Sequence, residues 1–280
     1  MRRRRTASEL ETRAAGRAAP VAFAGGGASE PLLMLRRRGL DPRPSGPDLP
    51  FPAGLGAAAE DAIVERLGHY AFRLFLRGAI LRPRGFAPGQ ATRYLAAPKA
   101  RAAAEDLVAL GLAERLPRGR YRLLRPARSF GGTLEWWLGR ELERRLGFEV
   151  ATAVRSGAPG VGGDLDVVAA AEGKLVYLET KSSPPKHLSR AEVTAFLRRL
   201  RAVRPDVALF VVDTALRLSD KVLPMFEEAL GARAPAPRRI FRETWALGPH
   251  LYLVNAREDL VENVCRAIAE GLGALAPARP

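Results

Sequence analysis

The sequence predicts an α/β protein: a mixed sheet flanked by helices, preceded by a small unit of helices and a hairpin and by a disordered tail. Three observations support this fold class. Residues 129–280 alternate between helical and strand-like patterns. Residues 55–128 show three helical patterns and then two short strands. Residues 1–54 are rich in Arg, Ala, Gly and Pro and keep no regular period, which predicts a disordered basic tail.

Composition narrows the class of protein. The chain has 280 residues, 47% of them hydrophobic, so it is long enough to form a substantial core. No apolar run approaches the roughly 18–20 residues that span a bilayer, so no membrane partner is expected. A single cysteine, Cys265, excludes an intramolecular disulfide, and the three histidines are far apart in the sequence. We therefore expect a cytoplasmic protein without a zinc site.

The net charge of +15 is concentrated in the first half of the chain. Residues 1–54 carry 10 basic and 5 acidic residues, residues 55–128 carry 14 and 6, and residues 129–280 carry 21 and 19. A composition biased toward Arg explains why 40 of the 45 basic residues are Arg, but it does not explain this asymmetry. The asymmetry indicates a polyanion-binding module, and the expected partner is nucleic acid, most simply double-stranded DNA.

Residues 55–128 predict a compact unit whose order of elements is helix, helix, helix, hairpin. The expected elements are helices at 58–76, 90–95 and 100–110 and strands at 112–116 and 120–124. Pro117-Arg118-Gly119 supplies the turn between the two strands. This order resembles a winged helix-turn-helix.

The resemblance implies that basic side chains of the recognition helix and the wing contact phosphates. The residues expected to bind nucleic acid in this way are Arg93, Lys99, Arg101, Arg115, Arg118, Arg120 and Arg122. A winged helix used only for packing or for dimerisation is the alternative.

Residues 129–280 predict a mixed sheet with helices on both of its faces. The expected elements are helices at 134–146, 189–203, 219–230 and 258–272 and strands at 149–154, 164–170, 174–181, 207–212 and 251–254. Glu172-Gly173 separates two of these strands and predicts a hairpin. Asp213, at the end of the strand at 207–212, is expected to cap a turn or a helix.

The predicted hairpin brings two carboxylates together. If Glu172-Gly173 is a two-residue turn, Asp166 lies opposite Glu179, with their Cβ atoms roughly 4.5–5.5 Å apart. Asp164 then lies opposite Lys181. Two carboxylates placed in this way repel each other unless a cation lies between them, and a hard cation such as Mg²⁺ prefers oxygen ligands. A register slip of one residue would destroy this arrangement.

A third carboxylate, Glu135, lies in the helix before the sheet. Its position falls within the apolar stripe formed by Leu138, Leu142 and Leu146, whereas Glu141 and Glu143 fall off that stripe. A glutamate directed toward a sheet is costly unless something compensates its charge, and a shared metal would do so. Lys181 is one of only five lysines in the chain, which suggests a role that arginine cannot fill.

Gly163-Asp164-Leu165-Asp166-Val167-Val168 followed by Leu178-Glu179-Thr180-Lys181, with Glu135 upstream, resembles the PD-(D/E)XK superfamily, in its resolvase- and RecB-like branch. The resemblance covers roughly residues 129–256. It implies a restriction-endonuclease-like sheet in which Asp166, Glu179 and Glu135 bind Mg²⁺ or Mn²⁺ and Lys181 orients or activates water. Leu165 stands where the family name has proline. The resemblance leaves open whether Asp164 joins the metal ligands or pairs with Lys181.

These expectations imply a metal-dependent endonuclease that hydrolyses phosphodiester bonds of DNA and is positioned by a winged-helix domain. The implied boundaries are 1–54 for the tail, 55–128 for the winged-helix-like domain and 129–280 for the nuclease-like domain. The alternative is a catalytically inactive DNA-binding regulator or complex subunit that keeps the nuclease fold. An RNA substrate stays open because a basic wing suits either polymer. Dimerisation, common in this class of enzyme, also stays open.

Overall fold

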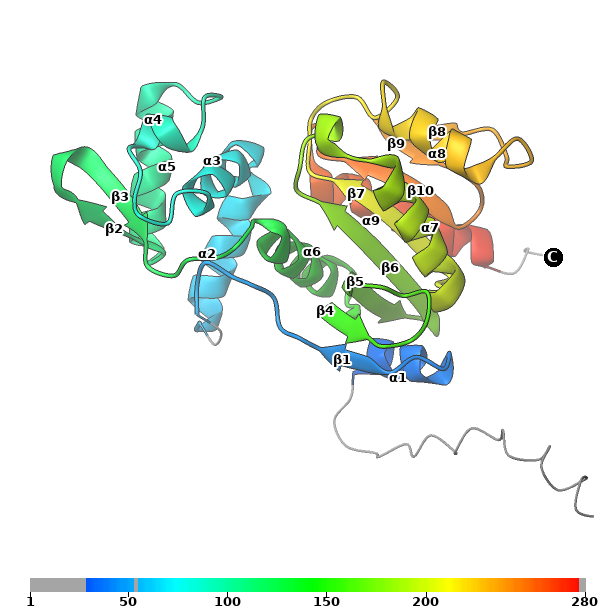
Figure 1. Cartoon of the computed structure of the whole chain (residues 1–280). Helices are drawn as coiled ribbons and strands as arrows, with labels where there is room; N and C mark the ends of the chain where they lie inside the picture. The colour runs from blue at the N-terminus through cyan, green and yellow to red at the C-terminus, as the bar shows by residue number, and fades with distance from the viewer. Residues whose placement is uncertain (1–28, 53–54, 277–280) are drawn as a thin grey trace, which may run out of the picture.

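The computed structural model describes residues 29–52 and 55–276. It shows a small unit of helices and a hairpin beside a larger part that is built on one mixed sheet (Figure 1). The predicted mixed sheet with flanking helices is therefore confirmed. Across these described ranges, none of the helices is both long and apolar enough to cross a membrane.

The N-terminal segment is not a disordered tail throughout. Helix α1, Glu30–Arg37, buries Leu32, Met34 and Leu35, and strand β1, Pro42–Pro44, pairs antiparallel with β4 at the edge of the sheet. The predicted tail over residues 1–54 is thus wrong for residues 29–52, while residues 1–28 lie outside the described residues. Elements of eight and three residues are too short to establish a period, which explains why the pattern was missed.

The helical unit has the predicted order of elements. It contains α2 (Ala57–Gly68), α3 (Tyr70–Ile80), α4 (Pro88–Ala91), α5 (Ala97–Ala109), β2 (Ala113–Leu116), a 3-10 turn η3 (Pro117–Gly119) and β3 (Arg120–Leu123). The single helix expected at 58–76 is interrupted at His69, whose ψ of 114° is extended, so that α2 and α3 are separate helices. Strands β2 and β3 pair antiparallel, with Glu114 opposite Arg122.

The sheet has eight strands in the order β1-β4-β5-β6-β7-β10-β9-β8. The remaining strands are β4 (Glu149–Ser156), β5 (Asp164–Ala171), β6 (Lys174–Lys181), β7 (Val207–Val212), β8 (Arg238–Phe241), β9 (Thr244–Ala246) and β10 (Leu251–Asn255). Pairing is antiparallel from β4 to β6, parallel from β6 through β7 to β10, and antiparallel beyond β10. Strands β8 and β9 were not predicted, because segments of four and three residues show no clear alternation.

Helices cover both faces of the sheet and enclose two hydrophobic clusters. The helices of this part are α6 (Gly131–Leu146), a 3-10 turn η4 (Pro185–His187), α7 (Arg190–Val203), α8 (Val222–Leu230) and α9 (Leu260–Leu275). One cluster contains residues of α6 and α9, and the other contains residues of α1, α7 and α8. The alternating side chains of β6 divide between them, since Val176 and Leu178 face the first cluster and Tyr177 the second.

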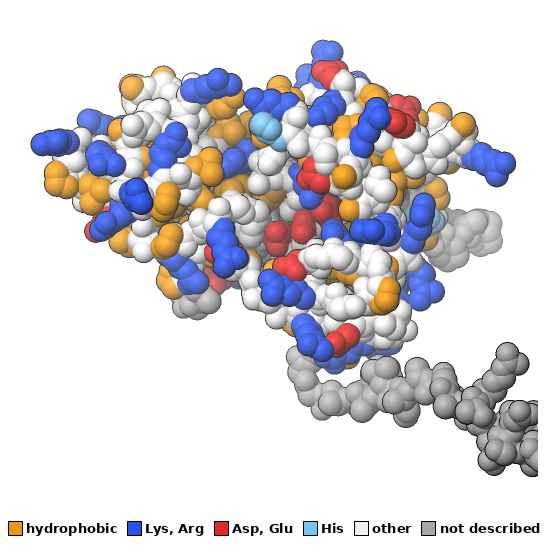
Figure 2. Space-filling view, in the orientation of Figure 1, with side chains coloured by type: hydrophobic (Ala, Val, Ile, Leu, Met, Phe, Trp, Pro, Cys, Tyr) orange, Lys and Arg blue, Asp and Glu red, His pale blue; other side chains and the backbone are white. Residues whose placement is uncertain are grey.

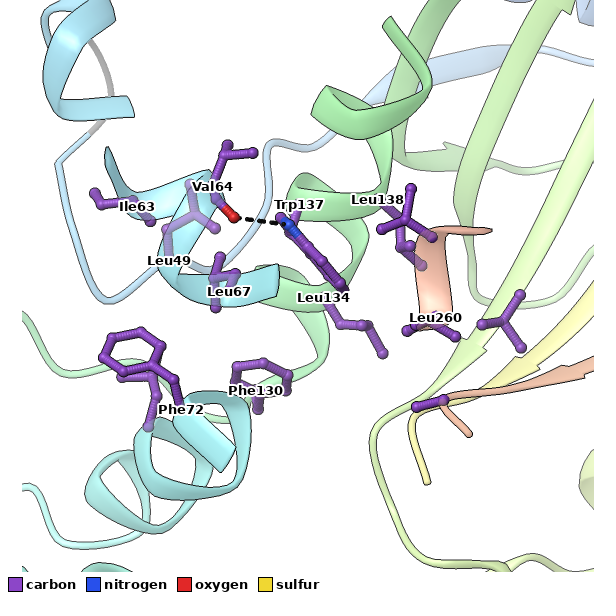
Figure 3. Packing of buried hydrophobic residues seen from close by; sticks show 14 of the residues in the cluster. Leu49, Ile63, Val64, Leu67, Phe72, Phe130, Leu134, Trp137, Leu138 and Leu260 are labelled. Carbon is purple, nitrogen blue, oxygen red and sulfur yellow. Dashed lines mark hydrogen bonds between the residues drawn. The ribbon is translucent and has the colours of Figure 1, made fainter. Parts of the chain in front are cut away.

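The first cluster continues without a break into the helical unit, so the two parts share a core. Figure 3 shows Trp137 of α6 packed among Val64, Leu67 and Leu134. The indole Nε1 of Trp137 donates a hydrogen bond of 3.2 Å to the carbonyl oxygen of Val64. A buried aromatic that also satisfies its polar atom fixes the position of α2 against α6.

A buried ion pair also joins the two parts. Asp213, fully buried at the end of β7, accepts hydrogen bonds of 3.0 Å from Arg73 and 2.7 Å from Arg77, both of α3. The guanidinium of Arg73 also lies over the ring of Trp137, 4.6 Å from its centroid. The expectation that Asp213 caps a turn or helix is therefore wrong. Its charge is instead compensated by two arginines from a distant segment of the chain.

Candidate functional site

The predicted hairpin register is correct. Strands β5 and β6 pair from Ala171 opposite Lys174 to Val167 opposite Leu178, and Glu172 and Gly173 form the turn with φ of 52° and 71°. Two consecutive positive φ angles are typical of the tight turns that fix hairpin register. The ladder ends there, one step before the predicted pair of Asp166 with Glu179, which is not among the paired residues.

Beyond Val167 the regular pairing of β5 with β6 ends, and the side chain of Asp166 replaces it. Oδ2 of Asp166 accepts hydrogen bonds from the backbone N–H of Thr180, at 2.7 Å, and from its hydroxyl, at 3.2 Å. Oδ1 of Asp166 accepts no hydrogen bond from any described residue. Asp166 of β5 therefore contacts the Glu179-Thr180-Lys181 segment of β6 through Oδ2, and its Oδ1 atom stays available for another ligand.

Glu179 is buried and is surrounded by donors. Its Oε1 atom accepts a hydrogen bond of 2.8 Å from Nζ of Lys181. Its Oε2 atom accepts hydrogen bonds from the hydroxyl of Tyr177 and the guanidinium of Arg199. Burial acts to raise the pKa of Glu179, but the charges of Lys181 and Arg199 outweigh it, and the pKa is lowered. Glu179 is therefore an ionised group whose charge is already compensated.

Lys181 stays protonated in this arrangement. Burial acts to lower its pKa, but the charge of Glu179 and the hydrogen bond to it outweigh burial, so the pKa is raised. A lysine whose pKa is raised does not accept a proton near neutral pH. Lys181 therefore acts as a fixed positive charge at the C-terminal end of β6.

Glu135 and Asp166 are the carboxylates whose charge is not compensated. The pKa of Glu135 is raised to about 8, mainly by burial and in addition by the negative charges of Asp166, Asp164 and Glu179. Burial and the charge of Glu179 raise the pKa of Asp166 to about 7. Glu135 is half-buried in α6 and makes no hydrogen bond to another described residue. The prediction that Glu135 points from α6 toward the two strand carboxylates is thus consistent with its strong dependence on their charges.

Two other acidic residues behave differently from the sequence prediction. Asp164 pairs with Arg155 of the neighbouring strand, at 3.1 Å, and not with Lys181. Glu141, placed off the apolar stripe of its helix, is buried and accepts from Arg144 and Arg145 of the same helix. These arginines of the same helix compensate the charge of the buried Glu141.

Sequence reasoning missed Arg199 of α7. Besides Glu179, it donates to the hydroxyl of Tyr177, at 3.0 Å, and to the carbonyl oxygens of Val161 and Gly162, at 2.9 and 2.6 Å. Arg199 thereby fixes Glu179 to the glycine-rich loop between β4 and β5. A signal for it existed: it lies three residues after Phe196 and four before Val203, and therefore on the buried face of the helix.

The arrangement fits a metal ion only in part. No three Asp, Glu, His or Cys side chains among residues 29–52 and 55–276 are grouped closely enough to enclose an ion as they stand. The free Oδ1 of Asp166 and the carboxylate of Glu135 have the oxygen chemistry that Mg²⁺ or Mn²⁺ prefers. Both oxygens of Glu179 are occupied by donors. The residues that fit such an ion best are therefore Asp166 and Glu135.

The acidic site lies between two basic surfaces. Acidic side chains gather between the helical unit and the sheet, with Lys and Arg side chains on both sides of them (Figure 2). All seven basic residues predicted to contact nucleic acid are exposed. Arg115 is paired with Glu105, Arg122 with Glu114, and Arg120 donates to the carbonyl oxygen of Gly85.

The other four predicted contact residues have no carboxylate partner among the described residues. Lys99 and Arg101 lie in the first half of α5, Arg118 lies in the turn of the hairpin, and Arg93 precedes α5. Arg93 donates to the hydroxyl of Tyr94 at 3.0 Å. These four residues are free to contact an external anion.

Comparison with known proteins adds information about the fold only. No family model matches the sequence, and no curated protein matches it. The crystal structure of protein VC1899 from Vibrio cholerae is similar, with a TM-score of 0.51 and 16% identity, over 90% of this chain and 66% of that one. Can2 from Sulfobacillus thermosulfidooxidans, solved in complex with cyclic tetra-adenylate, gives a TM-score of 0.49 and 12% identity, over 86% and 60%. The chain thus spans less than two thirds of the length of either protein.

Proposed function

We propose that the chain is a divalent-metal-dependent nuclease that hydrolyses phosphodiester bonds of DNA. The observation that carries this proposal is the pair Asp166 and Glu135. Two carboxylates whose charges are not compensated lie beside the protonated Lys181 at one edge of the sheet. Two ionised carboxylates held close together repel each other and destabilise the fold unless a cation lies between them. A bound Mg²⁺ or Mn²⁺ would remove this repulsion, which explains why the two side chains are placed together.

In this proposal Asp166 and Glu135 hold the ion, and Glu179 has a different role from the one the family resemblance implies. Bound there, the ion would supply Lewis-acid chemistry toward the scissile phosphate and toward a water molecule. Glu179 holds Lys181 in place through the 2.8 Å hydrogen bond. Lys181 stabilises negative charge on the phosphate as it develops, and does not remove a proton from water, because its pKa is raised.

The helical unit would bring nucleic acid to this site. Its basic side chains without carboxylate partners suit contacts to phosphates, which position a duplex without reading its sequence. The larger share of the net charge also lies there, with 14 basic against 6 acidic residues at 55–128. Electrostatic attraction of this kind is sequence-independent and depends strongly on salt.

The proposal is tested by incubating the purified chain with supercoiled plasmid and Mg²⁺ or Mn²⁺. We expect metal-dependent nicking that falls by about 100-fold or more in both variants, since Asp166→Asn removes a proposed ligand of the ion and Lys181→Ala removes the positive charge that acts on the phosphate. Asp61→Asn, which changes an exposed carboxylate of α2, is the matched control and should nick like the wild type. Equal nicking by the wild type and both site variants would refute the assignment.

One observation favours a second candidate, a nuclease fold that binds DNA without cutting it. Glu179 is fully engaged by Lys181, Tyr177 and Arg199, as a structural carboxylate would be. The same assay separates the two functions. DNA binding without metal-dependent nicking, unchanged in Asp166→Asn, would support the inactive scaffold.

A further inference from the structure

A cavity of about 300 Å³ lies between the helical unit and the sheet. On one side it is lined by Tyr70, Leu74 and Arg77 of α3 and by Tyr94, and on the other by Pro184 and Leu216. Its lining is largely apolar with a few polar groups, and its size is at the lower end of the range for small-ligand sites.

The mouth of this cavity exposes two large apolar side chains. Tyr94 is 65% exposed and Leu216 is 60% exposed, although most side chains of these types are buried. Tyr94 belongs to the helical unit, and Leu216 follows the end of β7. An exposed aromatic ring beside a cavity with an apolar lining offers a flat surface on which a planar group can stack.

Positive charge surrounds Tyr94. The guanidinium of Arg93 lies over its ring, 5.1 Å from the centroid. The hydrogen bond and charge of Arg93, with a further contribution from the charge of Lys186, lower the pKa of Tyr94. Lys186 belongs to the sheet part, so basic groups from both parts act on this ring.

A second cavity, of about 720 Å³, lies next to the first, since Ala215 and Leu216 line both. Among the described residues, its lining includes one acidic side chain, Asp220, and four basic ones: Lys186, Arg217, Lys221 and Arg257. Lys221 donates to the backbone carbonyls of Lys186 and Leu188. These two neighbouring cavities, called the groove below, therefore place an aromatic and apolar surface beside a strongly basic one.

The groove starts next to the candidate site. Pro184 follows Lys181 by three residues, and the backbone N–H of Asp213, which lines the first cavity, donates a 2.9 Å hydrogen bond to the carbonyl oxygen of Lys181. The wall of the first cavity at Asp213 is therefore hydrogen-bonded to the backbone of Lys181, a residue of the candidate site.

We propose that this groove binds one unpaired nucleotide beside the scissile phosphate, with its base stacked on Tyr94 against Leu216 and its phosphates held by Lys186 and Arg217. Aromatic rings next to basic side chains are the usual means of binding single-stranded nucleic acid without sequence preference. The inference rests on the proposed function for its ligand, and it adds that the preferred substrate contains unpaired bases.

The test is binding of a fluorescent single-stranded DNA oligonucleotide by the full chain in EDTA, where metal-dependent cleavage does not occur. We expect Tyr94→Ala to weaken binding roughly 5- to 150-fold, the usual effect of losing one base–aromatic stacking contact. Tyr94→Phe keeps the ring and should bind like the wild type. Leu81→Ala is the matched control, because Leu81 is 69% exposed on the same unit but lines neither cavity.

Two further measurements separate stacking from a merely structural role. A 2-aminopurine base in the oligonucleotide should lose fluorescence when bound by the wild type and by Tyr94→Phe, but not by Tyr94→Ala. Binding of a fully paired duplex should be unchanged in Tyr94→Ala. Equal losses for single strand and duplex, or equal affinities of Tyr94→Ala and Leu81→Ala, would overturn the proposal.

The outcome is distinguishable from that of the proposed function. Tyr94-dependent binding of the single strand without any cleavage in Mg²⁺ or Mn²⁺ would remove the nuclease assignment and leave the nucleotide site. If Asp166→Asn abolishes cleavage but Tyr94→Ala leaves the affinity for the single strand unchanged, the nuclease assignment stands and the nucleotide site is refuted.

Discussion

Nζ of Lys181 donates a 2.8 Å hydrogen bond to Oε1 of Glu179. Because Arg199 and Tyr177 donate to the other oxygen, the glutamate of the E-x-K segment is neutralised within the protein. Asp166 and Glu135 lack such partners, and their pKa values are raised, whereas the pKa of Glu179 is lowered. The site thus divides into a pair that holds a lysine in position and a pair available to bind a cation.

Removal of Arg199 should destabilise the fold. Arg199→Met leaves Glu179 with a buried charge that lacks one partner and also frees the carbonyl oxygens of Val161 and Gly162. Breaking a buried ion pair in this way costs about 3–5 kcal/mol. The control is Arg198→Met, which changes the exposed neighbouring arginine. Urea denaturation of the wild type and of these two variants measures the free energy of unfolding. A loss in Arg199→Met no larger than in Arg198→Met would contradict the assigned role.

The ion pair between Asp213 and Arg73 should couple the helical unit to the sheet. Asp213→Ala leaves Arg73, which is 1% exposed, without its carboxylate, and we expect a loss of about 3–5 kcal/mol in the free energy of unfolding. Asp220→Ala changes an exposed acid a few residues away and should cost less than about 1 kcal/mol. Similar denaturation midpoints for the two variants would show that the pair contributes little.

The two uncompensated carboxylates should make stability depend on pH. The pKa of Asp166 is about 7 and that of Glu135 about 8, both higher than the roughly 4 of an unfolded chain. The folded state therefore binds more protons between about pH 4 and pH 8, and this contribution to stability is lost as the pH rises through that range.

The measurement is thermal unfolding in EDTA at pH 5 and pH 8. We expect the wild type to lose several degrees more than Asp166→Asn between these pH values, because the variant removes one titrating group and the repulsion on the other. Mg²⁺ at pH 8 should restore stability to the wild type alone. Identical pH dependences in the two proteins would count against this explanation.

The turn η3, which joins β2 and β3 in the helical unit, should contribute to DNA binding. Arg118 lies in the turn without a carboxylate partner, so Arg118→Ala should weaken duplex binding uniformly across sequences and reduce the salt slope of log Kd by about 1. Arg37→Ala, on α1 and already paired with Glu30, is the control. Titrations at several salt concentrations provide the slope, and an unchanged slope would exclude Arg118 from the interface.

The sequence was sufficient for the part of the site that depends on local geometry. The turn at Glu172-Gly173 fixes the register of β5 and β6 as far as Val167, the residue next to Asp166. Helical spacing likewise directed Glu135 toward the sheet. These are short-range rules that need no knowledge of the rest of the fold.

Partners from distant segments could not be predicted. Arg199 reaches Glu179 from 20 residues away, and Arg73 reaches Asp213 across 140 residues. Which arginine compensates which buried carboxylate depends on how α3 and α7 pack, and residue spacing along one element carries no such information. The same limit applies to β1, whose three residues form a strand only because the edge of β4 is available for pairing.

Isothermal titration calorimetry of Mn²⁺ binding at pH 8 tests most directly whether Asp166 and Glu135 hold a divalent ion. We predict binding by the wild type with release of protons at pH 8, mainly from Glu135, whose pKa is about 8. The affinity should decrease as the pH is lowered, because Asp166, with a pKa of about 7, then becomes protonated as well. Asp166→Asn and Glu135→Gln should each lose most of this affinity, whereas Asp61→Asn should keep it. Absence of binding by the wild type, or equal affinity in all four proteins, would contradict the account.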